Sequence, residues 1–191
     1  MPKIILASKS PRRRELLDRL GLAHTVIGVD ADEWYPDDLT PQGIVKYISN
    51  TKACAAANMV APEDIVITAD TMVFLDDKKL GKPKDEDEAF AMLSALSGRE
   101  HTVCTGVTVA QGNRTLTEAE TTRVRFAKLD EATIRAYIRT GDPMDKAGAY
   151  GIQGCGALLV EGIEGDYFNV VGLPMRRISE MLRKFGVKIL A

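Results

Sequence analysis

The amino-acid sequence predicts an α/β protein built on a mixed β-sheet. Short β-branched segments alternate with amphipathic segments of helical period along most of the 191 residues. One stretch, residues 101–129, departs from this alternation because two strand-like segments meet there at a Gln-Gly-Asn turn. Strands joined by a short turn pair antiparallel, whereas helical crossovers join parallel strands, so the pattern indicates a mixed sheet.

Each predicted element is bounded by turn residues or helix caps. Strands are expected at residues 3–7, 24–29 and 64–75, in the two halves of 101–129, and in a last hairpin at 157–174. Helices are expected at residues 11–21, 41–59, 85–98, 130–141 and 175–186. A polar loop at 30–40 and a long glycine-rich loop at 142–156 connect them. No repeat or low-complexity segment interrupts this order.

The composition excludes several classes of protein. A net charge of -2 offers no global attraction for nucleic acid, so we expect no nucleic-acid partner. Three widely spaced cysteines without a CxxC pair fit reduced thiols better than disulfides or a zinc site. The first apolar run is too short for a signal peptide, and no segment reaches the roughly 18 apolar residues of a membrane span. We therefore expect a cytoplasmic protein without membrane contact.

The first predicted helix places three arginines where the helix dipole disfavours cations. Helical spacing puts Arg13 on the inward leucine face, Arg12 beside it, and Arg14 on the far side. A solvated helix surface is the alternative, and it suits Arg14. For Arg12 and Arg13 we favour an anion site, because a helix N-terminus presents unpaired N–H groups and Ser8 and Ser10 add hydroxyls.

Two lysines and two carboxylates occupy unusual positions. Lys52 falls on the apolar face of its helix, so it either extends to the edge of the core or points into a cleft. Asp70 interrupts a strongly apolar strand, where an ionised carboxylate requires a cation or serves in proton transfer. Lys82 lies in a Gly-Lys-Pro turn and Glu33 in an acidic loop. For both, an ordinary solvated side chain is the alternative.

Missing motifs narrow the chemistry. His24 and His101 are the only histidines, which disfavours a histidine relay or a His-rich metal site. The sequence has no GxxxxGK[ST] loop, no GxSxG elbow and no GxGxxG after the first strand. Positive charge at a helix start, inward lysines and a few carboxylates suit a phosphate ester held with a hard divalent cation.

Four segments carry a family resemblance. LASKSPRRREL, ADTMV, GKP and DKAGAYGIQG closely resemble the Maf family of nucleoside triphosphate pyrophosphatases, in the family's order and over essentially the whole chain. The resemblance implies one domain over residues 1–191, with an elongated mixed sheet and two lobes around a central cleft, similar to inosine triphosphate pyrophosphatase. It also implies hydrolysis of a nucleoside triphosphate to the monophosphate and pyrophosphate with a divalent metal, Mg²⁺ or Mn²⁺.

The resemblance assigns roles residue by residue. Ser8, Arg12 and Arg13 match the phosphate-binding motif. Glu33, Lys52, Asp70 and Lys82 match the charged catalytic cluster. Asp70 is either the general base or, with Glu33, a metal ligand, and the sequence does not separate these roles. The lysines and arginines neutralise charge on the phosphate oxygens and the departing pyrophosphate.

The same resemblance points to a substrate class. Arg12, Thr71 and Gln153 match the branch that prefers dTTP and UTP, and a glutamine amide suits the edge of a pyrimidine base. The family name is also associated with cell division and septum formation, so a nucleotide-sensing regulator is the alternative function. A dimer is common in related proteins, although nothing in this sequence identifies an interface.

Overall fold

The computed structural model describes residues 2–76 and 78–190. Its strands are β1 (Ile4–Ala7), β2 (Thr25–Ile27), β3 (Ile65–Leu75), β4 (Lys78–Leu80), β5 (Glu100–Gln111), β6 (Arg114–Phe126) and β7 (Val160–Glu164). They form a sheet in the order β2-β1-β3-β5-β6-β7, with β4 paired to β3. β1 is parallel to β2 and β3, whereas β4 is antiparallel to β3 and β7 to β6. The predicted α/β class with a mixed sheet is confirmed.

Three of the helices begin directly after capping residues that the sequence indicates. They are α1 (Pro11–Arg19), α2 (Pro41–Ala57), α3 (Glu86–Leu96), α4 (Glu131–Ile138), α5 (Tyr167–Val171) and α6 (Met175–Lys184), with short 3-10 helices η1 (Asp142–Asp145), η2 (Ala147–Ala149) and η3 (Gly154–Leu159). Thr40, Asp85 and Asp130 each accept a hydrogen bond from the N–H three residues on, which caps α2, α3 and α4. Within the described chain, no helix combines the length and apolarity needed to cross a membrane.

The chain divides into two compact units. The first comprises residues 1–70, 105–120 and 172–191, and the second comprises residues 71–104 and 121–171. β3 passes from the first unit to the second between Asp70 and Thr71. A single domain over residues 1–191, and the cleft between lobes that the resemblance implies, stay predictions.

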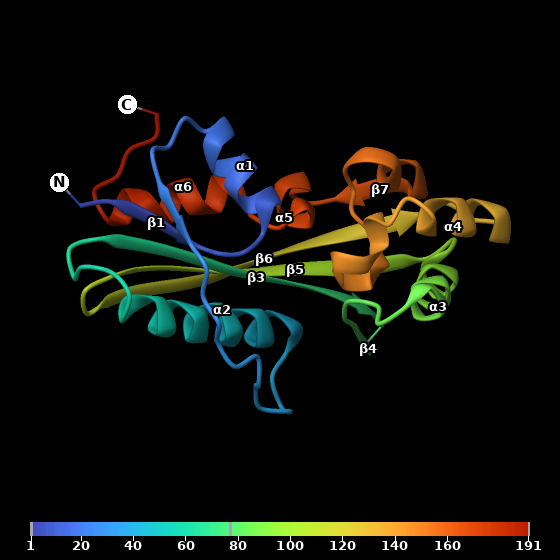
Figure 1. Cartoon of the computed structure of the whole chain (residues 1–191), viewed down its shortest axis with the longest axis horizontal. Helices are drawn as coiled ribbons and strands as arrows, with labels where there is room; N and C mark the ends of the chain where they lie inside the picture. The colour runs from blue at the N-terminus through green and yellow to red at the C-terminus, as the bar shows by residue number, and fades with distance from the viewer. Residues whose placement is uncertain (1, 77, 191) are drawn as a thin grey trace. The chain divides into compact units, whose positions relative to one another are not determined.

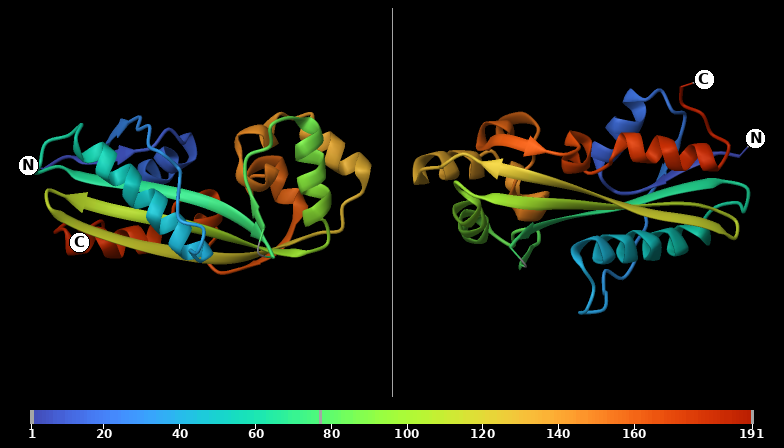
Figure 2. Two further views of the ribbon diagram at one scale, coloured as in Figure 1. Left: turned by 90° about the horizontal axis from the view of Figure 1, so that it is seen from below. Right: turned by 180° about the vertical axis from the view of Figure 1, so that it is seen from behind.

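The first unit is layered. α1 and α6 cover one face of its part of the sheet, and α2 covers the other (Figures 1 and 2). Leu16 and Leu17 anchor α1 because both are fully buried, each contributing about 2 kcal/mol. The axis of α2 runs very close to β5. A Cβ atom at Gly106 would lie 2.1 Å from the Val45 carbonyl oxygen, so only glycine permits this approach.

The second unit corrects the prediction of one long irregular loop at residues 142–156. Much of this segment forms η1, η2 and the start of η3. The turns are set by left-handed backbone at Gly148 (φ 70) and Ala149 (φ 59) and by the Lys146 side chain, which binds the η1 residues Asp142 and Asp145. Local side-chain hydrogen bonds therefore stabilise 3-10 turns in a segment whose glycine content predicts a loop.

The predicted last hairpin at residues 157–174 is wrong in its second half. β7 pairs antiparallel with β6, but the chain then forms α5 instead of a returning strand. Gly165 turns the chain with φ 127, and the Asp166 carboxylate accepts a hydrogen bond from the Phe168 N–H at 2.8 Å. An aspartate in this position starts a helix, and that signal outweighs the β-branched residues that follow.

Candidate functional site

The first turn of α1 is organised by a serine that precedes the helix. Ser8 follows β1, and its N–H donates to the Ile27 carbonyl at 3.0 Å, which continues the pairing with β2. Its hydroxyl accepts hydrogen bonds from the Ser10 N–H at 3.2 Å and from Arg13 Nη1 at 3.3 Å. Ser10 is the N-cap residue, but within the described chain its hydroxyl makes no capping hydrogen bond. Ser8 thus orders the turn although it lies outside the helix, two residues before the N-cap.

Arg13 points inward, as its spacing from the leucines predicts. Its Nε donates to the Gly172 carbonyl at 2.8 Å, and its Nη1 donates to the Ala69 carbonyl at 2.8 Å. Burial lowers the pKa of Arg13, while the nearby negative charge of Asp70 raises it. An arginine stays protonated against shifts of this kind, so Arg13 brings a permanent positive charge close to Asp70.

The two neighbouring arginines differ from Arg13. Arg14 is exposed on the far side of α1, with its Nε 3.7 Å from the Asp18 carboxylate. Arg12 is half-buried, and its charge contributes to lowering the pKa of Arg13. The guanidinium groups of Arg12 and Arg13 therefore lie close enough to repel each other, and an anion between them would relieve that repulsion.

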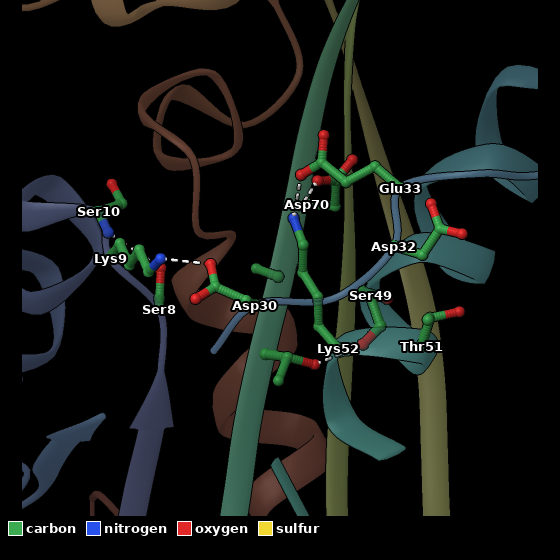
Figure 3. A network of polar contacts seen from close by, with 12 residues as sticks. Ser8, Lys9, Ser10, Asp30, Asp32, Glu33, Ser49, Thr51, Lys52 and Asp70 are labelled. Atoms are coloured by element: carbon green, nitrogen blue, oxygen red, sulfur yellow. Dashed lines mark hydrogen bonds and ion pairs between the residues drawn. The ribbon is translucent and has the colours of Figure 1, made fainter. Parts of the chain in front are cut away.

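Three of the predicted catalytic residues meet in the first unit. Lys52 Nζ donates to Asp70 Oδ1 at 2.7 Å and lies 3.0 Å from Glu33 Oε1. Figure 3 shows the Lys52 side chain extending from α2 to both carboxylates. Asp70 is 7% exposed, whereas the Glu33 side chain is 65% exposed. The cluster therefore has a buried end at Asp70 and a solvent-facing end at Glu33.

Alternation along β3 explains why Asp70 faces α2. Thr68 and Asp70 are two residues apart and lie on the same face of the strand. Thr68 Oγ1 donates to the Ser49 carbonyl of α2 at 2.7 Å, and Ser49 and Thr108 share a hydroxyl hydrogen bond of 3.0 Å. These buried contacts fix the part of α2 that carries Lys52, one helical turn beyond Ser49.

One carboxylate oxygen of the cluster stands apart from the others. Asp70 Oδ2 is buried and accepts no hydrogen bond from any residue that the structure describes. A buried carboxylate oxygen in this condition is costly, and a cation or a proton would relieve the cost. The buried oxygen therefore makes Asp70 a candidate for binding a cation or accepting a proton.

The same atom bears on metal binding. Among residues 2–76 and 78–190, no three acidic, histidine or cysteine side chains come together as a metal site. A divalent cation would need Asp70, Glu33, and oxygens from a bound phosphate or water. Mg²⁺ is commonly held by one or two carboxylates and substrate phosphates, so these residues fit such a shared site.

The remaining predicted site residues belong to the second unit. Thr71 directly follows Asp70 in β3 and is half-buried. Lys82 is exposed after β4, and Gln153 is the half-buried N-cap residue of η3. A hydrogen bond of 3.0 Å from the Gly148 N–H to the Gly81 carbonyl joins the segment before Gln153 to the turn of Lys82. The roles of these three residues stay predictions.

A second network escaped the sequence analysis. Tyr137 donates its hydroxyl hydrogen to Asp142 Oδ2 at 2.6 Å and accepts from the Gly151 N–H at 3.1 Å. Lys146 Nζ donates to the Asp142 carbonyl oxygen at 2.7 Å and to Oδ1 at 2.9 Å. These bonds brace the segment that leads to Gln153. The spacing of four residues between Asp142 and Lys146 is the sequence signal that could have revealed them.

An exposed aromatic pair lies next to the cluster in the sequence. Trp34, the single tryptophan, follows Glu33 and is 63% exposed. Its ring packs edge-on against Tyr47 of α2, with 6.2 Å between ring centroids. Trp34 is therefore a natural fluorescence reporter for the loop that carries Glu33.

Comparisons with known proteins identify the family. The family model described as Maf-like protein matches residues 3–185. A "dTTP/UTP pyrophosphatase" of Pelotomaculum thermopropionicum is 48% identical, with 100% of each chain covered. A protein of the same name from Thermoanaerobacter sp. strain X514 is 51% identical, with 98% of this chain and 100% of that protein covered.

Among solved structures, the Ham1 protein of Staphylococcus aureus matches with a TM-score of 0.48 and 16% identity, covering 65% of this chain and 72% of that one. A likeness this weak carries no functional conclusion. The sequence matches extend over nearly the whole chain and include the Asp70, Lys52 and Arg13 segments described above. The chain belongs to the Maf family.

Proposed function

We propose that this protein is a nucleoside triphosphate pyrophosphatase that hydrolyses dTTP and UTP, and related modified pyrimidine nucleotides, to the monophosphate and pyrophosphate. The observation that carries the proposal is the Asp70–Lys52–Glu33 cluster, in which Lys52 binds one oxygen of Asp70 and the other is buried with no hydrogen-bond partner among the described residues. The two relatives, which are 48% and 51% identical to this chain and are named dTTP/UTP pyrophosphatases, support the proposal.

The chain's own residues suit attack by water on a phosphoanhydride. The water oxygen bonds to the α-phosphorus while its proton passes to Asp70. The bond from that phosphorus to the bridging oxygen breaks, and pyrophosphate departs with the electron pair. Lys52 holds Asp70 in place through Oδ1, which leaves Oδ2 as the oxygen for the proton. Positive charge from Lys52 and Arg12 offsets the charge that develops on the phosphate oxygens.

A divalent cation, Mg²⁺ or Mn²⁺, belongs to this proposal. Asp70 and Glu33 would hold it together with phosphate oxygens of the substrate. When bound, such an ion supplies charge neutralisation and lowers the pKa of a bound water. Asp70 serves in this proposal as base or as metal ligand, and either role uses Oδ2, which has no hydrogen-bond partner among the described residues.

The family resemblance assigns further residues to the proposed function. Ser8 and Arg12 bind phosphate oxygens, and Lys82 stabilises the departing pyrophosphate. Arg12, Thr71 and Gln153 determine the preference for dTTP and UTP. A glutamine amide offers both a donor and an acceptor to a pyrimidine edge, which supports the role of Gln153.

A nucleotide-sensing regulator of cell division is the less favoured function. A sensor requires phosphate and base contacts but no buried carboxylate with an unpaired oxygen. The relatives carry the name of an enzyme. The expected lack of nucleic-acid contacts, the cytoplasmic location and the possible dimer stay predictions.

Product identification tests the proposal. The purified protein is incubated with each of the common nucleoside triphosphates and Mg²⁺ or Mn²⁺, and products are separated by ion-exchange chromatography. We expect dTTP and UTP to give dTMP and UMP with stoichiometric pyrophosphate, and little turnover of purine nucleotides. Release of inorganic phosphate with a nucleoside diphosphate would contradict the cleavage site. Equal turnover of all the nucleotides would contradict the substrate class.

A further inference from the structure

Arg13 has a different set of contacts from the one expected of a phosphate-binding arginine. Three of its hydrogen bonds go to the protein, to the carbonyl oxygens of Gly172 and Ala69 and to the hydroxyl of Ser8. The two carbonyl bonds are both 2.8 Å long and use different nitrogens of the guanidinium fork. A planar fork with several bonds of this kind holds its acceptors in a fixed relative geometry.

The Ala69 bond occurs where β3 loses a neighbour. β1 pairs with β3 from Ile4 opposite Ile65 to Leu6 opposite Ile67, and β1 ends at Ala7. Beyond that point the chain turns away into α1. Arg13 donates to the backbone of β3 just past the end of this pairing and thus replaces a strand partner.

This position is mechanically linked to Asp70. The Ala69 carbonyl belongs to the planar peptide unit that also contains the Asp70 Cα atom. Fixing that plane fixes the positions of the Asp70 N and Cα atoms, and this restricts the directions in which the Asp70 side chain can leave the strand. Asp70 must hold this direction to keep Oδ1 within 2.7 Å of Lys52 Nζ while Oδ2 stays buried.

We propose that Arg13 is a positioning residue, which orients the Asp70 carboxylate by clamping the Ala69 and Gly172 carbonyl oxygens, and that Arg12 is the arginine of this helix that binds the triphosphate. The inference rests on the proposed function, because it assigns Asp70 to the chemical step. It departs from the phosphate-binding role expected of Arg13 in the sequence analysis, because the hydrogen bonds of Arg13 to Gly172, Ser8 and Ala69 hold the protein itself.

The first test separates turnover from binding. Arg13→Lys keeps a positive charge but loses the fork, and Arg13→Ala loses both. We expect kcat for dTTP to fall about 100-fold in Arg13→Lys, because small displacements of a reacting group have costs of that size. KM should stay within about threefold of the unmodified protein, since uniform substrate binding is retained. A raised KM with unchanged kcat would overturn the proposal.

The second test measures binding where no turnover interferes. Calorimetric titration with dTTP is performed on Asp70→Asn and on Asp70→Asn combined with each arginine variant. Addition of Arg13→Lys should change Kd by less than about threefold, whereas Arg12→Ala should raise Kd about tenfold or more, as expected for loss of a charged phosphate contact. Equal losses for both arginines would make Arg13 a phosphate ligand and overturn the proposal.

The helix also provides a matched control. Arg14→Ala removes a guanidinium from the same turn at an exposed position, and neither kcat nor Kd should change.

A double-mutant comparison tests whether Arg13 acts through Asp70. If it does, Arg13→Lys should reduce kcat far less in the Asp70→Asn background than in the otherwise unmodified protein; independent, additive losses would contradict this coupling. Thermal unfolding of each variant verifies folding, and if Arg13→Ala does not fold, Arg13→Lys carries the test. Absence of dTTP hydrolysis in the unmodified protein would instead contradict the proposed function.

Discussion

Two lysines of this protein are each held by two carboxylates, yet their surroundings differ. Lys52, in the first unit, contacts Asp70 and Glu33, and its side chain is 17% exposed. Lys146, in the second unit, contacts Asp142 and Asp145, and its side chain is 12% exposed. Charge and burial are thus nearly equal at the two lysines.

The difference lies in the second carboxylate oxygen of Asp142 and of Asp70, which the lysine does not bind. Asp142 Oδ2 accepts the Tyr137 hydroxyl at 2.6 Å, so both oxygens of this carboxylate are satisfied. Asp70 Oδ2 is buried and has no hydrogen-bond partner in the described part of the chain. A hydrogen-bond network in which every buried polar atom has a partner rigidifies the backbone. A buried polar atom without a partner lowers stability, and such atoms are often found at functional sites. The comparison teaches that saturation of hydrogen bonds, more than charge or burial, separates the candidate catalytic lysine from the structural one.

The strongest test of this comparison is the matched pair Asp70→Asn and Asp142→Asn. We expect Asp70→Asn to lower kcat for dTTP about 10²–10⁴-fold, because an amide cannot accept the proton from water. Nucleotide binding, followed by Trp34 fluorescence, should persist. Asp142→Asn should reduce stability instead of removing turnover. Near-normal turnover in Asp70→Asn would remove this carboxylate from the mechanism.

A third buried group, His101, extends the comparison to the dependence of stability on pH. His101 is 2% exposed, its Nε2 is 2.7 Å from the Tyr150 hydroxyl, and its Nδ1 has no hydrogen-bond partner among the described residues. Burial lowers the pKa of His101 to about 4 from 6.5. Because the folded state resists the proton that the unfolded state binds, stability should fall as pH decreases from 6.5 to 4. The loss should be about 3 kcal/mol.

Urea unfolding between pH 7 and pH 4 measures this loss. Carboxylates also titrate in that range, so the unmodified protein is compared with His101→Gln at each pH. We expect the difference in unfolding free energy between the two proteins to shift by about 3 kcal/mol in favour of the variant as pH falls. A constant difference across the range would mean that His101 titrates alike in both states.

The smallest expected effect is on stability and concerns the hydrogen bonds that Lys146 makes to Asp142 and Asp145. Lys146→Met should lower the free energy of unfolding by about 2 kcal/mol, since the Asp142 and Asp145 carboxylates lose charged hydrogen bonds. Lys52→Met should act mainly on kcat, because Lys52 binds Asp70 Oδ1 and, in the proposed function, offsets charge on the phosphate oxygens. Denaturant unfolding and dTTP turnover are measured for both variants. A larger stability loss in Lys52→Met than in Lys146→Met would reverse the assignment of roles.

Local pattern alone predicted much of the fold. Thr40, Asp85 and Asp130 cap their helices as the sequence indicates, because a side chain three residues from its N–H partner needs no tertiary contact. The failures were also local. In place of the second hairpin strand the structure has α5, whose start depends on Asp166. In place of much of the glycine-rich loop it has short 3-10 helices, which the contacts of Lys146 stabilise. In both places, side-chain hydrogen bonds outweighed the propensity of the flanking residues.

The sequence by itself determined the order of most elements, the inward face of Arg13 and the anomaly of a carboxylate within an apolar strand, since periodicity and burial cost are properties of neighbouring residues. Only the tertiary structure decided the partners. Lys52 and Asp70 are 18 residues apart, and Arg13 and Gly172 are 159 apart, so no local pattern encodes these contacts. The pairing depends on where β1 ends beside β3 and on how closely α2 approaches β5, and both follow from packing of the whole sheet.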